Sequence, residues 1–348
     1  MLSMQPLKSA QGAVNYYTKA FNYYAGDATA MCWLGNGSQI LQLDGVVDKQ
    51  MMLSLLEGRL PNGQVLKNFK GEHRPGFDMT FSAPKSVSIL VGLGVAPELI
   101  KFHDAAVKHA ITQIEKEFAQ ARVSSNVQVH YEKTDNLLIA AFRQPSSRAN
   151  DPALHTHSVT MNITFLNGQA KSLASDKQRY NGVIEQIQNN QRYCGLLYRQ
   201  HLANSLKEAG FHLRLTGDGL FEIDGMPEEL LKEFSIRRQD IEQYMADEGW
   251  SGAKSASKAA EMSRPKKEEH NLDILQSDWH ERAKTLGFDA AQFMANRDQK
   301  SPDNLFFIIK NKLLVLFKNN PEPSEREAAT ACVKVAIETL SQRASVFS

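Results

Sequence analysis

Two histidines in one short apolar segment most constrain the fold of this chain. Residues 154–165 read Leu-His-Thr-His-Ser-Val-Thr-Met-Asn-Ile-Thr-Phe, a composition typical of a strand inside a sheet. Because side chains alternate between the two faces of a strand, His155 and His157 project from one face and Thr156 from the other. Two imidazoles on one face of a rigid strand can share a metal ion, although two structural histidines would give the same pattern.

Two pairs of tyrosines near the N-terminus favour a catalytic interpretation of those histidines. Tyr16 and Tyr17 fall in a helix that we expect over residues 10–20, and Tyr23 and Tyr24 follow seven residues later. On a continuous helix this spacing is about two turns, so the second pair would stack over the first. Aromatic core packing usually explains such pairs. The flanking residues are polar here, so four phenols indicate an accessible cluster.

Composition limits the number of domains and the cellular compartment. At roughly 150 residues per domain, the 348 residues predict about two domains. The formal net charge is +1, so any DNA-binding surface must be a local patch. The three cysteines lie far apart, which excludes a Cys-x-x-Cys zinc site and favours the reducing cytoplasm. We expect no membrane span, since there is no apolar run of about 18 residues. We expect no secretory signal either, since the N-terminus lacks a charged region followed by an apolar one.

Further motifs follow the tyrosines in a fixed order. Residues 56–63 read Leu-Glu-Gly-Arg-Leu-Pro-Asn-Gly, and residues 73–88 read His-Arg-Pro-Gly-Phe-Asp-Met-Thr-Phe-Ser-Ala-Pro-Lys-Ser-Val-Ser. Residues 147–157 then read Ser-Arg-Ala-Asn-Asp-Pro-Ala-Leu-His-Thr-His. This order resembles the conjugative relaxases of the TraI/TrwC type, the MobF group, over residues 1–250. The resemblance implies an α+β fold of the HUH endonuclease class, a central antiparallel sheet flanked by helices with the histidine strand in its middle.

The resemblance also implies an activity. Such a relaxase nicks one strand at the transfer origin of a conjugative element by tyrosine transesterification, stays bound as a 5′-phosphotyrosyl ester and later rejoins the strand. Tyr16 would attack first, and Tyr23 or Tyr24 would act later; the residues themselves do not rank the members of each pair. The implied partners are single-stranded or hairpin DNA, relaxosome accessory proteins and a coupling protein, and we expect a monomer.

The chemistry of a phenol leads to the same requirement for a metal. With a pKa of about 10, a tyrosine is a weak nucleophile at neutral pH and needs assistance. A metal held by His155 and His157 would withdraw charge from the scissile phosphate. Asp78 would orient a metal-binding histidine through its other ring nitrogen, or accept the phenolic proton. A plain carboxylate at the end of a strand is the alternative interpretation of Asp78.

The third metal ligand departs from the family pattern. The family usually places a third histidine eleven residues before the first of the pair, and this chain has Gln144 there. An amide oxygen is a neutral, hard ligand, so it shifts the preference of the site from zinc or nickel toward magnesium or manganese. We therefore predict one divalent metal ion held by Gln144, His155 and His157.

Five basic residues are candidate contacts to DNA phosphates, although each alone could be a solvated surface charge: Arg74, Lys85, Arg143, Arg148 and Arg192. Two other functions fit parts of the pattern. A rolling-circle replication initiator shares the chemistry, but initiators place their tyrosines after the histidine strand. A catalytically weak module that binds single-stranded DNA would explain Gln144 as a decayed site.

The predicted organisation has three parts. Residues 1–248 form the relaxase domain, residues 249–270 a mobile segment that covers DNA, and residues 271–348 a helical extension leading toward a helicase domain outside this sequence. No Gly-x-x-x-x-Gly-Lys-Ser/Thr phosphate loop is present, so we expect no ATPase in the chain. The less obvious element predictions are a hairpin over residues 32–43, a helix over 97–123, a strand pair of 127–133 with 137–143, and one helix over 182–209.

Overall fold

A five-stranded antiparallel sheet carries the two histidines on its middle strand. The computed structural model describes residues 2–22, 30–66, 73–124, 129–176, 181–217, 219–263 and 271–296. In spatial order the strands are β1 (Leu2–Pro6), β3 (Gly76–Ser82), β7 (Pro152–Met161), β6 (Ile139–Ser146) and β2 (Met31–Leu34). The predicted α+β class and the central place of the histidine strand are therefore confirmed.

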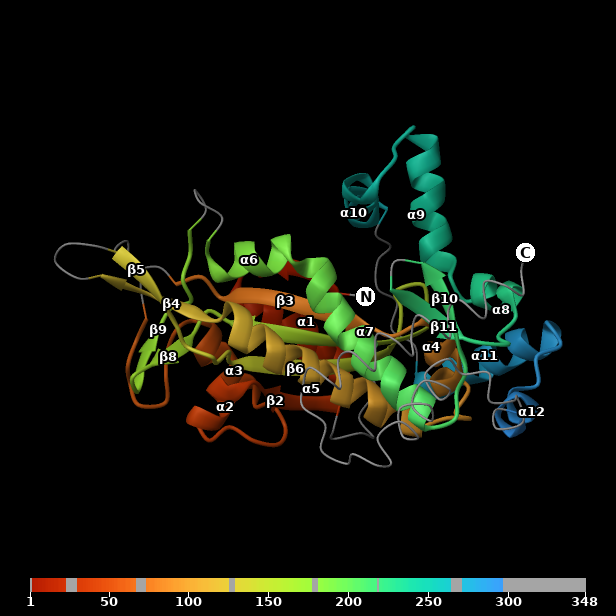
Figure 1. Cartoon of the computed structure of the whole chain (residues 1–348), viewed down its shortest axis with the longest axis horizontal. Helices are drawn as coiled ribbons and strands as arrows, with labels where there is room; N and C mark the ends of the chain where they lie inside the picture. The colour runs from red at the N-terminus through yellow and green to blue at the C-terminus, as the bar shows by residue number, and fades with distance from the viewer. Residues whose placement is uncertain are drawn as a thin grey trace, which may run out of the picture. The chain divides into compact units, whose positions relative to one another are not determined.

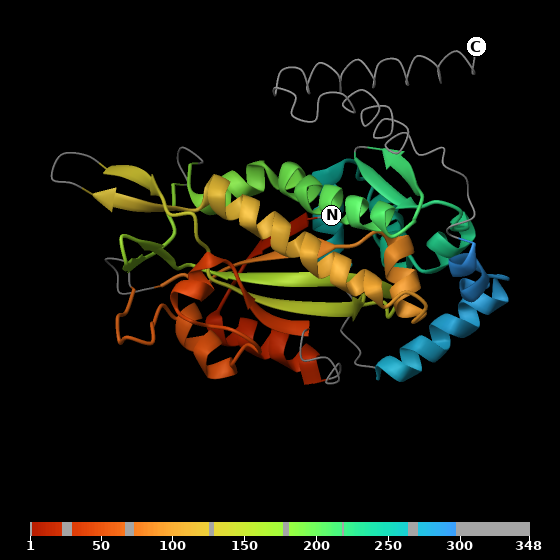
Figure 2. The ribbon, with the colours of Figure 1, turned by 60° about the horizontal axis from the view of Figure 1, so that its bottom comes forward.

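Helices cover both faces of this sheet (Figures 1 and 2). One face, which carries the histidines, packs against α1 (Ala10–Asn22) and α3 (Lys49–Leu56). The other face packs against α4 (Lys85–Gly92), α5 (Glu98–Phe118) and α7 (Gln191–Glu208). Two hydrophobic cores result, one on each side of the sheet, and β7 contributes to both.

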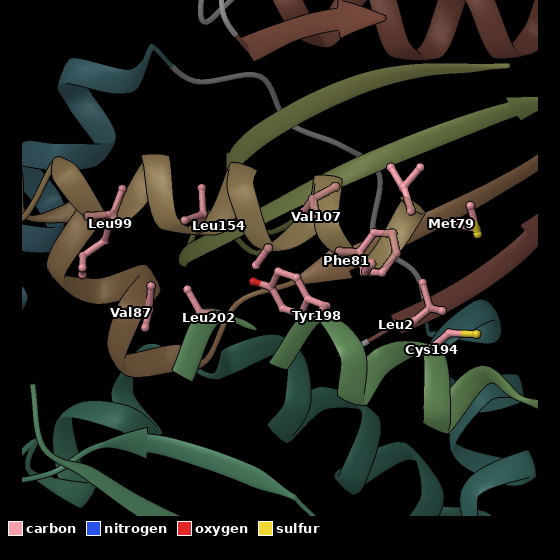
Figure 3. Packing of buried hydrophobic residues seen from close by; sticks show 14 of the residues in the cluster. Leu2, Met79, Phe81, Val87, Leu99, Val107, Leu154, Cys194, Tyr198 and Leu202 are labelled. Carbon is pink, nitrogen blue, oxygen red and sulfur yellow. The ribbon is translucent and has the colours of Figure 1, made fainter. Parts of the chain in front are cut away.

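The face of β7 away from the histidines is fixed by buried packing and by hydrogen bonds. Leu154 lies in the same cluster as Phe81 and Tyr198 (Figure 3). Between the two histidines, the Thr156 hydroxyl lies 2.8 Å from Nε2 of His103, whose Nδ1 lies 2.7 Å from the Tyr198 hydroxyl. Burial, and then the nearby charge of Arg143, lower the pKa of His103 well below its usual value, so this imidazole is neutral. The strand is therefore held in register from behind.

Short sequence signals account for two helix caps and two hairpins. Ser9 caps α1 by accepting a hydrogen bond from the Gly12 amide at 3.1 Å, and Asp48 caps α3 through the Met51 amide at 2.7 Å. The Asn-Gly turn at residues 167–168 joins two short strands. The hairpins are β8 (Thr164–Leu166) with β9 (Gln169–Lys171), and β10 (Leu213–Gly217) with β11 (Leu220–Ile223).

The prediction of a hairpin over residues 32–43 is wrong. After β2 the chain enters the short helix α2 (Asn36–Ile40), and β2 pairs instead with β6. The reason is tertiary: the Gly37 amide donates to the Leu137 carbonyl at 3.0 Å, and a Cβ on Gly35 would lie 2.3 Å from that carbonyl oxygen. The glycines permit close approach of a distant backbone rather than a local turn.

The strand pairing predicted for residues 127–143 is also wrong. Helix α5 ends at Phe118, and the chain continues as β4 (Gln120–Ser124), which pairs with β5 (Val129–Lys133). This frees β6 to pair with β7 and β2 in the main sheet. The long helix predicted to reach residue 123 ends at Phe118. The residues that follow it pair with β5 as a strand.

The C-terminal helices differ in two ways from expectation. The helix predicted over residues 182–209 is divided at Asn190 into α6 (Val183–Asn189) and α7. The segment predicted to be mobile contains the helix α10 (Ala253–Met262), and Arg237 of α9 (Ile236–Asp247) donates to the Ala260 carbonyl at 2.6 Å. The remaining helices are α8 (Glu228–Glu233), α11 (Leu272–Thr285) and α12 (Ala290–Ala295). Residues 1–294 form one compact unit, which therefore includes α11.

A buried carboxylate secures the β2–α2 junction and predicts a pH dependence of stability. Glu115 of α5 accepts hydrogen bonds from the amides of Asn36 and Leu137, both at 2.7 Å. Burial raises its pKa from 4.5 to about 7, although these two bonds act in the opposite direction. The folded state therefore holds the proton more tightly than the unfolded state. This contribution to stability is complete below pH 4.5 and is lost as the pH rises through about 7.

Glu115→Gln keeps the acceptor and removes the ionisation. Between about pH 5 and pH 8 the wild type should lose about 2 kcal/mol more of its free energy of unfolding than this variant does. Denaturant titrations at both pH values measure the difference, and Glu117→Gln, an exposed change on the same helix, is the control. Equal pH dependence in wild type and Glu115→Gln would contradict the prediction.

Candidate metal centre and tyrosine cleft

The two histidines of β7 lie close together and use the same ring nitrogen for their hydrogen bonds. Their ring centroids are 5.0 Å apart. Nδ1 of His155 donates to the Ala153 carbonyl at 2.7 Å, and Nδ1 of His157 donates to a carboxylate oxygen of Asp78 at 2.6 Å. Since a carbonyl and a carboxylate can only accept, each ring carries a proton on Nδ1, and Nε2 is the nitrogen that could bind a metal. This is the arrangement that metal-binding histidines need.

Asp78 joins the histidines to the tyrosines. It is buried on the histidine face of β3, and its Oδ2 accepts hydrogen bonds from Nδ1 of His157, from the Tyr17 hydroxyl at 2.9 Å and from the Thr80 hydroxyl at 3.2 Å. Burial would raise its pKa. The His157 charge and the hydrogen bonds outweigh burial, so the pKa of Asp78 lies below its usual value. The carboxylate is therefore ionised when it orients His157.

Gln144, the third predicted ligand, lies beside the histidines. In the ladder between β6 and β7 it stands directly opposite His155, so both side chains occupy the same face of the sheet. Gln144 is buried, and its Nε2 has no hydrogen-bond partner in the described residues. An unpartnered buried amide facing two imidazoles fits a ligand whose oxygen is turned toward a cation. In the described part of the chain, no group of three or more His, Cys, Asp or Glu side chains could hold a metal.

The first tyrosine pair divides into one buried and one accessible residue. Tyr17 is buried, stacked on Phe142 at 5.4 Å and bonded to Asp78. Tyr16 is half-buried, and Nη2 of Arg148 donates to its hydroxyl at 2.9 Å. The prediction of an accessible cluster therefore holds for Tyr16 and is wrong for Tyr17, whose ring fills the core beneath. Tyr23 and Tyr24 lie outside the described residues.

A cleft of about 310 Å³ opens over these groups. Tyr16, Tyr17, Asp78, Arg148 and His157 all line it, together with the end of β1 and the start of α1. The guanidinium of Arg148 also lies 5.6 Å from the centroid of the Tyr16 ring. The cleft thus brings a phenol, a guanidinium and one imidazole of the candidate metal centre together at the surface.

The other basic candidates lie elsewhere. Arg143 follows Phe142 on β6 and therefore projects from the opposite face of the sheet, where it pairs with Asp104. Lys85 donates to the Pro152 carbonyl at 2.8 Å, and burial lowers its pKa. Both are placed inside the fold rather than at the cleft. Arg74 is exposed and donates to Ser175 at 3.4 Å.

Arg192 lines a second cavity, of about 460 Å³, on the side of α7. Its other polar lining residues are Gln188, Asn189, Gln191 and Arg199. Arg199 is buried, donates to the Ser82 carbonyl at 3.4 Å, and has no partner for Nε in the described residues. Arg199 was not among the predicted site residues, because the sequence around an arginine within a helix does not indicate which cavity its side chain lines.

Two residues at the first cleft were also missed. Thr80 bonds both Asp78 and His157, and its position two residues after Asp78 on the same strand face was the available signal. Lys8 lines the cleft between β1 and α1, and only the folded structure brings it there.

Residues 10–286 match the family model described as TrwC relaxase. The chain is 38% identical over 305 residues to the multifunctional conjugation protein TraI of Escherichia coli strain K12, which covers 86% of the chain and 17% of that protein. A second Escherichia coli TraI is 37% identical over the same length. The chain therefore spans about a sixth of the length of these relatives.

Solved structures of a similar protein contain DNA. The conjugative relaxase TrwC in a copper-bound complex with oriT DNA has a TM-score of 0.75 and 33% identity, covering 83% of this chain and all of that one. TrwC bound to a 27-mer comprising the recognition hairpin and the cleavage site has a TM-score of 0.73 and 32% identity, with the same coverage.

Proposed function

The chain belongs to the TrwC relaxase family, and from this premise we propose that it is a metal-dependent DNA relaxase that nicks the transfer origin of a conjugative element. The observation that carries the proposal is the cleft in which the accessible Tyr16 phenol meets a cation and a histidine of a metal centre. Solved structures of a similar relaxase, TrwC, contain oriT DNA. The substrate is accordingly single-stranded or hairpin DNA at an origin of transfer.

Tyr16 is the proposed nucleophile of the first cut. Its oxygen attacks the scissile phosphorus, the bond to the 3′ oxygen breaks, and the DNA is retained as a 5′-phosphotyrosyl ester while a 3′ hydroxyl leaves. Arg148 stabilises the phenolate that attacks and that is released on rejoining, because its N–H already points at the phenol oxygen. Tyr17 and Asp78 hold His157 in its tautomer. Tyr23 and Tyr24 are proposed to act in the second transfer.

His155, His157 and Gln144 are proposed to hold one divalent metal ion. When bound, the ion would withdraw charge from the scissile phosphate. Metal-bound structures of a similar relaxase exist, and the neutral oxygen of Gln144 favours magnesium or manganese in this chain over zinc or nickel. Such a site should bind metal more weakly than three histidines and use a DNA phosphate to complete its coordination.

Exchanging Gln144 tests that ligand set. Gln144→His should tighten zinc and nickel binding about tenfold or more, roughly 1.4 kcal/mol, because imidazole prefers those ions. Gln144→Ala should slow nicking, and added manganese should partly restore it. Titration calorimetry with each metal, and nicking of an origin oligonucleotide across a metal series, provide the measurement. Identical metal profiles in wild type and both variants would show that Gln144 is not a ligand.

DNA recognition is proposed to use the α7 cavity and the segment 249–270. The cavity combines arginines with side-chain amides, the groups that read base edges and phosphates in single strands. Helix α10 packs beside α9 and carries Lys258 over the ring of Trp250. We propose that this arm covers bound DNA, and that relaxosome proteins and a coupling protein join the monomeric enzyme in the cytoplasm. In the described residues, no helix has the length and apolarity of a membrane span.

Nicking of a supercoiled plasmid that carries the origin tests the function. Wild-type protein with magnesium should convert it to the open-circular form and remain attached to the cut strand. Binding without cutting would support the alternative of a DNA-binding module in which Gln144 marks a decayed site.

A further inference from the structure

The loop that carries Arg148 is anchored from behind by a helix far away in the sequence. Residues 147–151 connect β6 to β7, and the loop closes on itself: the Ser147 amide donates to the Asp151 carbonyl at 2.9 Å, and the Ser147 hydroxyl accepts from the Asp151 amide at 3.2 Å. Asn150 adopts a left-handed conformation with φ of 60°, which asparagine tolerates better than most residues. The loop is therefore a compact turn with a defined shape.

Helix α11 supplies two anchors for this turn. Nε1 of Trp279 donates to the Asn150 carbonyl at 2.7 Å, and Nη2 of Arg282 donates to Oδ1 of Asp151 at 3.2 Å. Trp279 is fully buried, and its ring packs tightly where a Cβ on Gly92 would approach it to 3.0 Å. The tryptophan therefore has little freedom to move without moving the Asn150 carbonyl.

The same turn is bonded to the base of the α9–α10 arm. The other oxygen of Asp151 accepts from the Ile236 amide, the first residue of α9, at 2.9 Å. Arg282 also donates to the side chain and the carbonyl of Glu233 in α8, at 2.8 and 2.9 Å. Asp151 is 1% exposed, so its charge is balanced inside the protein by these donors.

We propose that Trp279 and Arg282 are positioning residues for the nicking reaction, because they hold residues 147–151 so that the Arg148 guanidinium stays on the Tyr16 phenol. The inference rests on the proposed function. It adds α11, which the sequence analysis assigned to a separate extension, to the set of elements that build the cleft. Asp151 thereby contacts both the first residue of α9 and the loop whose Arg148 bonds Tyr16.

The minimal test is Trp279→Phe, which removes the N–H donor and keeps an aromatic ring. In the free protein, hydrogen exchange of peptides covering residues 147–151 should become about tenfold faster, while peptides covering β7 stay unchanged. Trp33→Phe, a buried tryptophan in the other core, is the control and should leave both sets unchanged. Unchanged exchange in the 147–151 peptides overturns the proposal, whatever the enzyme does to DNA.

The second measurement is the rate of covalent-adduct formation on labelled single-stranded oligonucleotides that tile the transfer origin. Trp279→Phe should slow this rate about tenfold with DNA affinity unchanged within about twofold. The slowing should disappear in an Arg148→Gln background, since the anchor acts only through Arg148. Equal slowing in both backgrounds means general destabilisation and overturns the proposal. A wild type that forms no adduct refutes the proposed function instead, and the exchange result still decides on the anchor.

Arg282→Lys is the second variant and serves if Trp279→Phe does not fold. It keeps a positive charge beside Asp151 and loses the planar group that bridges Asp151 and Glu233. It should reproduce both effects. Asp278→Asn changes only the exposed partner of Arg282 and should behave as wild type. If Arg282→Lys shows neither the faster exchange nor the slower adduct formation, the proposal is contradicted.

Discussion

Tyr16→Phe should abolish the covalent DNA adduct and lower nicking by more than about a thousandfold, because it removes only the attacking oxygen. Single-strand binding should remain within a few fold of wild type, since the ring and its contact with Arg148 persist. Denaturing gel electrophoresis of labelled origin oligonucleotide detects the adduct directly, and fluorescence anisotropy measures binding of the same strand.

Tyr17→Phe is the matched comparison. Tyr17 is adjacent in sequence, yet it is buried with its hydroxyl on Asp78. Removing that hydroxyl loosens the support of His157 and should slow adduct formation about tenfold without abolishing it. The reverse result, an adduct retained in Tyr16→Phe and lost in Tyr17→Phe, would assign the nucleophile to Tyr17. An adduct retained in both variants would assign it to the second pair.

His157→Ala should eliminate metal-dependent nicking, by about a hundredfold or more, because it removes a ligand and leaves Asp78 without the imidazole it orients. The fold should survive, since β7 is held by its ladders to β3 and β6 and by the contact of Thr156 with His103. Nicking assays with magnesium and manganese measure the loss, and thermal unfolding shows whether the protein remains folded.

His130→Ala controls for the loss of an imidazole, because His130 is exposed and bonds Glu132 on its own strand. It should nick as wild type does. If His157→Ala unfolds and the wild type binds no metal in calorimetry, both histidines are structural and the metal proposal fails.

The histidine strand shows what a sequence reveals well. Strand alternation alone placed His155 and His157 on one face and Thr156 on the other, and the structure has this arrangement. Asp78 was expected to contact a histidine of the pair, and it accepts a hydrogen bond from Nδ1 of His157. These predictions succeeded because a period-2 pattern is local, so a few neighbouring residues determine it.

Predictions that depended on distant partners failed. Gly35 and Gly37 have the sequence of a turn, but they are needed where the Leu137 carbonyl approaches. Arg143 was a candidate for DNA binding, yet its place between Phe142 and Gln144 put it on the opposite face beside Asp104. The approach of the Leu137 backbone is set by packing across the whole domain and is invisible in a short window. The face that Arg143 occupies follows instead from strand alternation beside Gln144.

The contact of Thr156 with His103 fixes β7 from the face opposite the histidine pair. Because His103 and Tyr198 hold the strand from the side away from the metal, a ligand can be exchanged without moving the backbone that presents it. Gln144 pairs with His155 in the β6–β7 ladder, where the family usually has a histidine. With the proposed ligand set, the choice of metal becomes a single-residue variable, which selection or an engineer can change while the scaffold that aligns the phenol stays the same.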